Sequence, residues 1–382
     1  MPGRGRRIRS LSLFIVVAAL ASVVAVPAAA QWGVASSLYT QDGVEVAVDA
    51  RLFSVFAMLN GHGFDRDEEL GPPPLFRPRF SASREEARSR LGRPGPSMEG
   101  FKKLIDRFQV DPSEYARAAL HVGAAPRFEV GKGAPELARA LSAPLKGWYN
   151  EEGGAASFRN VARLATEKQK RMLDPLDKLC RQLASSVRLG SEEDQILDDS
   201  GPSGRVVVIL NELDAHSTLL REQIGDVTYI VTGPRRTKED DRTVLYAAGV
   251  AFARTLVSRE VEKHAKPGTL ADTYAQLSPK AKKALPDANA YLTELFACGM
   301  LHQVDKSAAC EGSPLEGEEA IQPVVAALNA RLKAYVADTT LLPEAMPALL
   351  APLAPAADAA PSGAAPPAAA GQGATGAKAP SH

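Results

Sequence analysis

The feature that most constrains this chain is a strongly apolar stretch at residues 243–257, which follows a short β-rich run at 227–232. The turn residues Gly233 and Pro234 close the β-rich run, which predicts a strand. The apolar stretch predicts a buried helix, and its small residues at 247–249 allow neighbouring elements to approach closely. We expect its core-facing side chains to be Val244, Leu245, Ala248, Phe252 and Leu256.

The first 30 residues have the features of a secretory signal peptide. Four arginines at positions 4–9 precede an apolar run at 11–26, and small residues at 28–30 lie just before Gln31. This arrangement predicts export to the periplasm or the extracellular space, with loss of residues 1–30. The apolar run is short for a membrane span, so we expect no stable span after cleavage.

Charge argues against a nucleic-acid partner. The whole chain carries 45 basic and 45 acidic side chains, and removal of the leader leaves 41 basic ones, for a net charge of −4. The mature protein would therefore lack the basic excess that binds phosphate backbones.

Three cysteines remain after export: Cys180, Cys298 and Cys310. An odd number in an oxidising compartment allows one disulfide and one free thiol. The short separation makes Cys298 and Cys310 the most economical pair. Metal binding by these cysteines is not expected, because the chain has no Cys-x-x-Cys pair.

Between the leader and the C-terminal tail the pattern is mainly helical. The strongest strand is predicted at 206–210, and we expect it to pair with the strand at 227–231. These features predict an α+β, predominantly α-helical fold, with a helical N-terminal region at 31–200 and a small β-sheet within 201–345. Residues 346–382 are rich in Ala, Pro and Gly, and this composition predicts a disordered tail.

The element order of the second region resembles a known family. A strand at 206–210, the segment 211–215, a strand at 227–232, Gly233-Pro234 and a helix follow one another. This order is similar to that of exported bacterial metallopeptidase-like proteins of the gluzincin type, over roughly residues 44–335. The resemblance implies a metallopeptidase-like helical core beside the small sheet.

The same resemblance implies positions for a zinc site. Residues 291–297 look like the later helix that supplies a third ligand, which would be Glu294. The motif His-Glu-x-x-His would place two imidazoles on one helical face and a general base between them. Here those positions hold Tyr246, Ala247 and Val250, which offer neither neutral imidazole nor carboxylate. We therefore expect a degenerate site with no metal and no other cofactor.

Three functional classes follow. The favoured one is a non-catalytic protein that binds a peptide or protein partner through the former substrate cleft. The second is an active zinc-dependent hydrolase with rearranged ligands from His216, His264 or His302 together with Glu294. The third is a structural protein of the cell envelope. A Glu260–His264 pair, four residues apart on a helix, is more typical of a solvated surface pair than of a metal site.

The favoured class also predicts a binding surface. The resemblance makes the strand before the motif helix the edge of the cleft, and an edge strand has unpaired backbone groups that accept an extended peptide. The predicted binding residues are Val227, Thr228, Tyr229, Ile230 and Val231.

Overall fold

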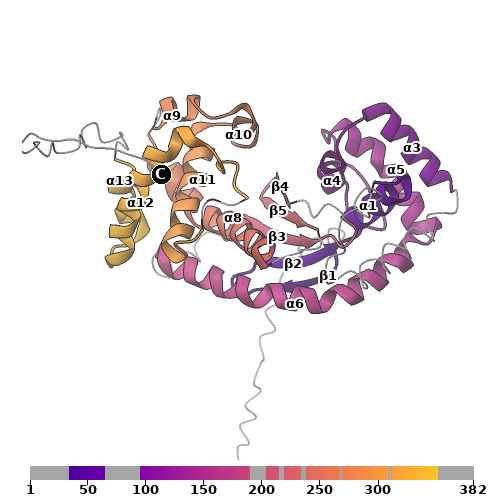
Figure 1. Cartoon of the computed structure of the whole chain (residues 1–382), viewed down its shortest axis with the longest axis horizontal. Helices are drawn as coiled ribbons and strands as arrows, with labels where there is room; N and C mark the ends of the chain where they lie inside the picture. Colours follow the sequence, from indigo (N-terminus) through magenta and orange to yellow (C-terminus); the bar gives the residue numbers. More distant parts are fainter. Residues whose placement is uncertain are drawn as a thin grey trace, which may run out of the picture.

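A mixed five-stranded sheet lies between two groups of helices (Figure 1). The computed structural model describes residues 34–64, 95–189, 204–214, 219–233, 238–266, 269–308, 310 and 312–351. The strands are β1 (Val34–Tyr39), β2 (Glu45–Asp49), β3 (Arg205–Leu210), β4 (Leu219–Ile224) and β5 (Val227–Thr232), in the spatial order β1-β2-β3-β5-β4. The three central strands β2, β3 and β5 run parallel, and β1 and β4 are antiparallel partners at the two edges.

The sheet is buried on both faces. Along β3, Val206 and Val208 face one hydrophobic core, while Val207 and Ile209 face the other. Successive side chains of a strand point to opposite faces, so a continuous apolar run is what a doubly covered strand requires. This explains why 206–210 is the strongest strand signal in the chain.

Helices make up most of the described chain. Their bounds are α1 Ala50–His62, α3 Pro96–Phe108, α4 Pro112–Leu120, α5 Glu136–Glu151, α6 Gly154–Val187, α8 Lys238–His264, α9 Ala271–Ala275, α10 Pro279–Ala284, α11 Ala288–Val304, α12 Gln322–Ala337 and α13 Leu342–Leu349, with a short 3₁₀ turn at Glu319–Ile321. The N-terminal helices α1, α3, α4 and α5 lie on one side of the sheet, and α8 to α13 lie on the other (Figure 1).

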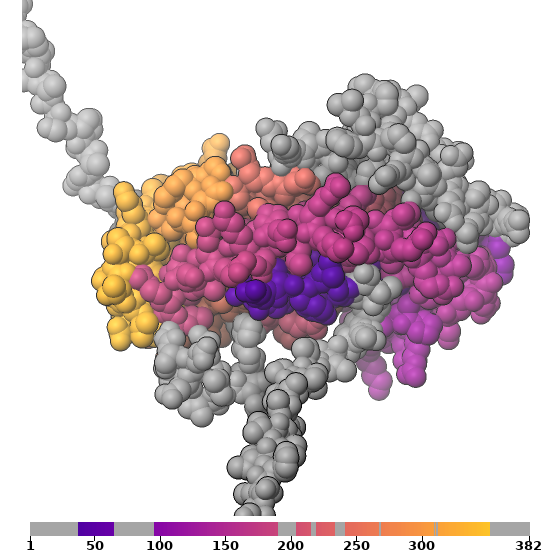
Figure 2. Space-filling model, turned by 90° about the horizontal axis from the view of Figure 1, so that it is seen from below, coloured from indigo at the N-terminus to yellow at the C-terminus, as the bar shows by residue number. Residues whose placement is uncertain are grey.

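The long helix α6 connects the two sides. Its first half contributes Phe158 and Ala165 to the N-terminal core, and its second half contributes Leu176 and Leu183 to the C-terminal core. Pro175 lies between these halves, within the helix. Seen from below, α6 runs across the molecule beside the N-terminal strands (Figure 2). The two cores are therefore held by one continuous element.

A buried ion pair fixes the junction of β2 and α1. The carboxylate of Asp49 accepts the backbone N–H groups of Arg51 and Leu52 and so caps α1. The guanidinium of Arg51 bonds the same carboxylate and also donates to the carbonyls of Leu120 and Val122. Burial alone would lower the pKa of Arg51, but the Asp49 carboxylate raises it overall. This pair ties α1 to the end of α4.

The predicted α+β, predominantly helical fold is confirmed. The apolar stretch at 243–257 lies inside α8, where Val244, Ala248 and Phe252 are buried and Leu245 and Leu256 are partly buried. The small residues do permit close approach, because a Cβ atom at Gly249 would lie 2.8 Å from Leu179 Cδ2 of α6. The predicted pairing of the strands at 206–210 and 227–231 is also confirmed.

The prediction that residues 227–231 form an edge strand is wrong. β5 pairs with β3 on one side and with β4 on the other, so its backbone is hydrogen-bonded along both edges. After β4, the turn at Gly225-Asp226, with Gly225 at φ +62°, reverses the chain so that β5 runs antiparallel to β4. β4 was not predicted, because Arg221, Glu222 and Gln223 make this strand polar, a composition that suits an edge position.

Two predicted boundaries also change. The N-terminal region at 31–200 is helical in most of its described part, but it supplies β1 and β2 to the same sheet as β3. The predicted tail begins too early, because α13 continues to Leu349 and buries Met346 and Leu349 against the C-terminal core. The signal peptide and residues 352–382 lie outside the described residues.

None of the described helices combines the length and the apolar character needed to cross a membrane.

Candidate functional site

The three positions predicted for a zinc motif lie in the C-terminal core. Ala247 and Val250 have no exposed surface, and Tyr246 is 1% exposed. The Tyr246 hydroxyl donates to Asp305 Oδ2 at 2.5 Å and lies 2.9 Å from Ser307 Oγ. Burial raises the pKa of Tyr246, and the hydrogen bond from Tyr246 lowers the pKa of Asp305. Tyr246 thus anchors the segment after α11 rather than facing an open site.

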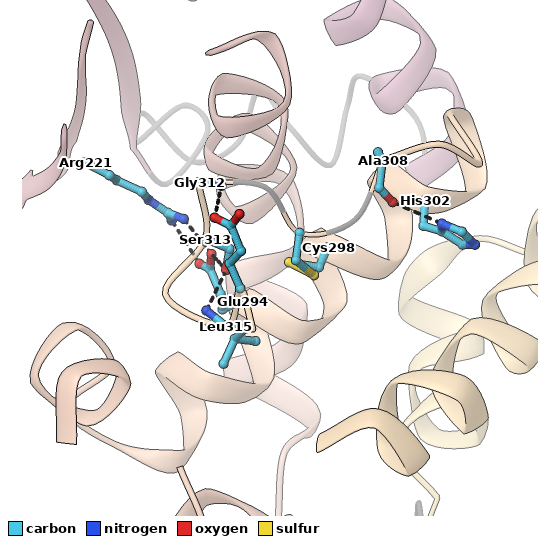
Figure 3. The surroundings of a disulfide bond; sticks show 10 residues. Arg221, Glu294, Cys298, His302, Ala308, Gly312, Ser313 and Leu315 are labelled. Atoms are coloured by element: carbon cyan, nitrogen blue, oxygen red, sulfur yellow. Dashed lines mark hydrogen bonds and ion pairs between the residues drawn. A yellow bond between two sulfur atoms is a disulfide. The ribbon is translucent and has the colours of Figure 1, made fainter. Parts of the chain in front are cut away.

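Glu294 is fully buried in α11 and is held by an arginine. Arg221 of β4 donates to both carboxylate oxygens, and the Ser313 hydroxyl donates to Oε1 at 2.6 Å (Figure 3). Burial would raise the pKa of Glu294, but the charge and hydrogen bonds of Arg221, together with Arg254 and Ser313, lower it overall. A zinc ion would have to displace this guanidinium, so the residues present do not fit the metal.

The histidines predicted as alternative ligands are not brought together with Glu294. His302 Nδ1 lies 3.1 Å from the carbonyl of Ala308, and His264 pairs with Glu260 at 3.3 Å on α8. His216 lies outside the described residues. Across the described ranges, no group of three or more His, Cys, Asp or Glu side chains has an arrangement that would hold a metal ion.

The predicted disulfide is present and lies close to Glu294. Cys298, one turn after Glu294 on α11, is joined to Cys310 (Figure 3). Cys180 is a buried free thiol, and burial raises its pKa well above the usual value. The disulfide holds the segment that carries Ser313, whose hydroxyl completes the contacts of Glu294.

A cleft with a volume of about 660 Å³ opens beside the contacts of Arg221, Glu294 and Ser313, and we call it the polar cleft. It is formed by the β4–β5 hairpin, by the middle of α8 and by the first turns of α11. Hydroxyl and amide side chains line it, among them Gln223, Thr228, Ser258, Asn289 and Thr293. Of the five predicted binding residues in β5, Thr228 is the one that lines this cleft.

Charge is unevenly distributed in the polar cleft. Its cationic group is Arg254, whose side chain is 19% exposed. The carboxylates of Asp226, Glu262 and Asp287 belong to exposed residues and also line the cleft. The cleft therefore combines a largely buried guanidinium with acidic groups closer to solvent.

The outer edge of the sheet is partly covered. Arg117 of α4 donates to the backbone carbonyl of Arg221 at 3.3 Å and also pairs with the Glu222 side chain. A peptide that added to β4 would have to displace Arg117. The edge of the sheet is thus a less open surface than the polar cleft.

Arg221 and Arg254 were not among the site residues predicted from the sequence. The signal for Arg254 was a lone arginine within the apolar stretch at 243–257, where a charged side chain needs a partner or a solvent path. Arg221 gave no such signal, because polar residues surround it in sequence.

Comparison with known proteins found no matching family model, no curated relative and no similar solved structure.

Proposed function

We propose that this is an exported binding protein that holds a segment of a peptide or protein partner in the polar cleft, without a catalytic metal. The observation that carries the proposal is the cleft itself: about 660 Å³ lined by hydroxyl and amide side chains from three elements. Binding sites for small ligands have volumes in this range. The leader at 1–30 supports the exported location.

The lining suits a polypeptide ligand. Peptide groups present one donor and one acceptor per residue, and they need partners when they leave water. Thr228, Thr293 and Asn289 bring such groups into the cleft from β5 and α11. The predicted surface therefore moves from the backbone of β5 to the side chains that β5, α8 and α11 present to the cleft.

A blocking substitution tests the proposal. Ala290 lines the cleft in the first turn of α11, and Ala290→Trp would fill part of the cleft. The substitution keeps the backbone N–H of residue 290, which donates a hydrogen bond to the side chain of Asp287. The matched control is Ala334→Trp, an exposed position on α12. The assay is selection of a random heptapeptide library on the folded mature protein, followed by calorimetry of the enriched peptides.

The expected result is that the unmodified protein and Ala334→Trp bind the enriched peptides, and that Ala290→Trp loses at least tenfold in affinity. Equal affinity for both tryptophan variants would place binding outside the polar cleft. Failure to enrich any peptide on the folded protein would also contradict the proposal.

A further inference from the structure

Among the largely buried charged groups next to the polar cleft, cations outnumber anions. Two guanidinium groups, those of Arg221 and Arg254, lie near one fully buried carboxylate, that of Glu294. Arg221 contacts both oxygens of that carboxylate, and Ser313 donates a third hydrogen bond. Glu294 is thus well satisfied without Arg254.

Arg254 makes only a long-range contact with Glu294. The distance from Arg254 Nη1 to Glu294 Oε2 is 3.9 Å, which is beyond hydrogen-bond range. Within the described residues, the guanidinium of Arg254 makes no hydrogen bond to any side chain or backbone group. Burial is the main cause of a lowered pKa for Arg254; the charges of Glu294 and Asp287 raise the pKa, and that of Arg221 lowers it, so these two carboxylates do not fully offset burial. A charged group in this condition is costly unless an anion is supplied.

The cleft supplies the space for that anion. Arg254, near the middle of α8, lines the cleft together with Thr228 and Thr293. A guanidinium presents its N–H donors in a planar fork that matches the two oxygens of a carboxylate. The other charged residues of the cleft limit which anion can bind to Arg254. Asp226, Glu262 and Asp287 repel a multiply charged anion, so they favour a ligand that is neutral or cationic apart from one carboxylate.

We propose that Arg254 binds a carboxylate of the peptide ligand, so that the polar cleft recognises a chain terminus or an acidic side chain rather than a phosphate group. This inference rests on the proposed function and specifies the ligand chemistry of the same cleft. A C-terminal carboxylate and an acidic side chain would make the same contact with Arg254, and the experiment below distinguishes between them.

The probes are acetyl-trialanine with a free C-terminus, the same peptide as its amide, acetyl-Ala-Glu-Ala-amide, sodium acetate and inorganic phosphate. Each is titrated at pH 7 into the mature protein, and binding is followed by amide chemical shifts in ¹H–¹⁵N NMR spectra. The variants are Arg254→Met, which keeps an unbranched apolar stem without the charge, and Arg254→Lys, which keeps the charge without the fork.

The expected result is that one or both carboxylate peptides bind at least tenfold more tightly than the amide. Arg254→Met removes this preference and Arg254→Lys retains part of it. Preference for the free C-terminus identifies terminus recognition, and preference for the glutamyl peptide identifies side-chain recognition. Peptide binding with no carboxylate preference overturns the inference and leaves the proposed function standing, as does tighter binding of phosphate than of acetate. Acetate binding that depends on Arg254, without binding of any peptide, overturns the proposed function instead.

Stability gives a second readout that a purely structural role would not produce. If Arg254 is held for a ligand, Arg254→Met leaves the urea midpoint of the free protein unchanged or raises it, because a poorly paired buried charge is removed. Arg221→Met is the matched control, and it lowers the midpoint because Glu294 loses its partner. A similar fall in both variants would show that Arg254 is a structural partner of Glu294 and would overturn the inference.

Discussion

Replacement of Glu294 by glutamine tests the central electrostatic feature of the site. The substitution keeps the shape of the side chain and removes its charge, while Arg221 remains 11% exposed with no carboxylate to face. Removal of one partner from a buried ion pair typically costs about 3 to 5 kcal/mol, because the other charge stays buried. Arg254 lies near the same carboxylate and adds to the uncompensated charge. We therefore expect a loss of about 3 to 5 kcal/mol in the free energy of unfolding.

The assay is urea denaturation at pH 7 followed by far-ultraviolet circular dichroism. The matched control is Glu167→Gln, which breaks an exposed pair with Lys170 on α6, where the side chains are 73% and 60% exposed. Exposed pairs contribute about 0 to 1 kcal/mol, so the control should change stability little. A loss below about 1 kcal/mol for Glu294→Gln would refute the reasoning, because Glu294 would then behave like an exposed residue.

The stabilisation that the Glu294–Arg221 ion pair provides should depend on pH in a defined direction. The pKa of folded Glu294 lies below the usual 4.5 despite burial, because the charge of Arg221 favours the carboxylate. A depressed pKa stabilises the folded state at pH values above the unfolded pKa, and this stabilisation is lost as pH falls through the folded pKa. The stability difference between the unmodified protein and Glu294→Gln should therefore be constant near neutral pH and shrink below about pH 4.5. A difference that grows on acidification would contradict this assignment.

Three further substitutions test other parts of the fold. Phe252→Ala removes a side chain that is 4% exposed in the C-terminal core and should cost about 3 to 5 kcal/mol in urea denaturation; a near-unchanged midpoint would show that α8 is not central. Asp49→Asn leaves Arg51 charged and buried and should cost about 3 to 5 kcal/mol by the same assay, whereas a loss below 1 kcal/mol would mean that the two backbone carbonyls suffice. Tyr246→Phe removes the hydrogen bond to Asp305, which is partly buried, and should cost about 1 kcal/mol; NMR titration should show the pKa of Asp305 rising toward its usual value.

Much of the fold was predictable where burial leaves a simple pattern. The strand at 206–210 and the helix at 243–257 are apolar because each is covered on more than one side, and composition alone marks such elements. β4 was not predictable by the same reasoning. Its Arg221 and Glu222 pair with different helices, α11 and α4, so a strand with two tertiary ion pairs looks like a polar loop in sequence.

The site was less predictable than the fold because it depends on contacts between distant residues. Arg221 and Glu294 are separated by 73 positions, and no local pattern links them. The resemblance singled out Glu294 as a ligand, and the structure does show it as the most buried carboxylate near the cleft. A buried glutamate alone indicates only that a positive charge lies nearby; it does not say whether that charge is a metal ion or a guanidinium.

Helix α8 shows how the two interpretations of Glu294 differ. Tyr246, Val250 and Arg254 are spaced four residues apart, so they follow one another along a slowly turning face of the helix. The first two positions are closed by packing, while the third reaches the polar cleft and lies 3.9 Å from Glu294. The positive charge that a zinc site would place opposite this glutamate is supplied here by two arginines from different elements. Arg221 and Ser313 already provide the hydrogen bonds of Glu294, and on this basis we propose that the guanidinium of Arg254 remains able to bind a ligand carboxylate in the polar cleft.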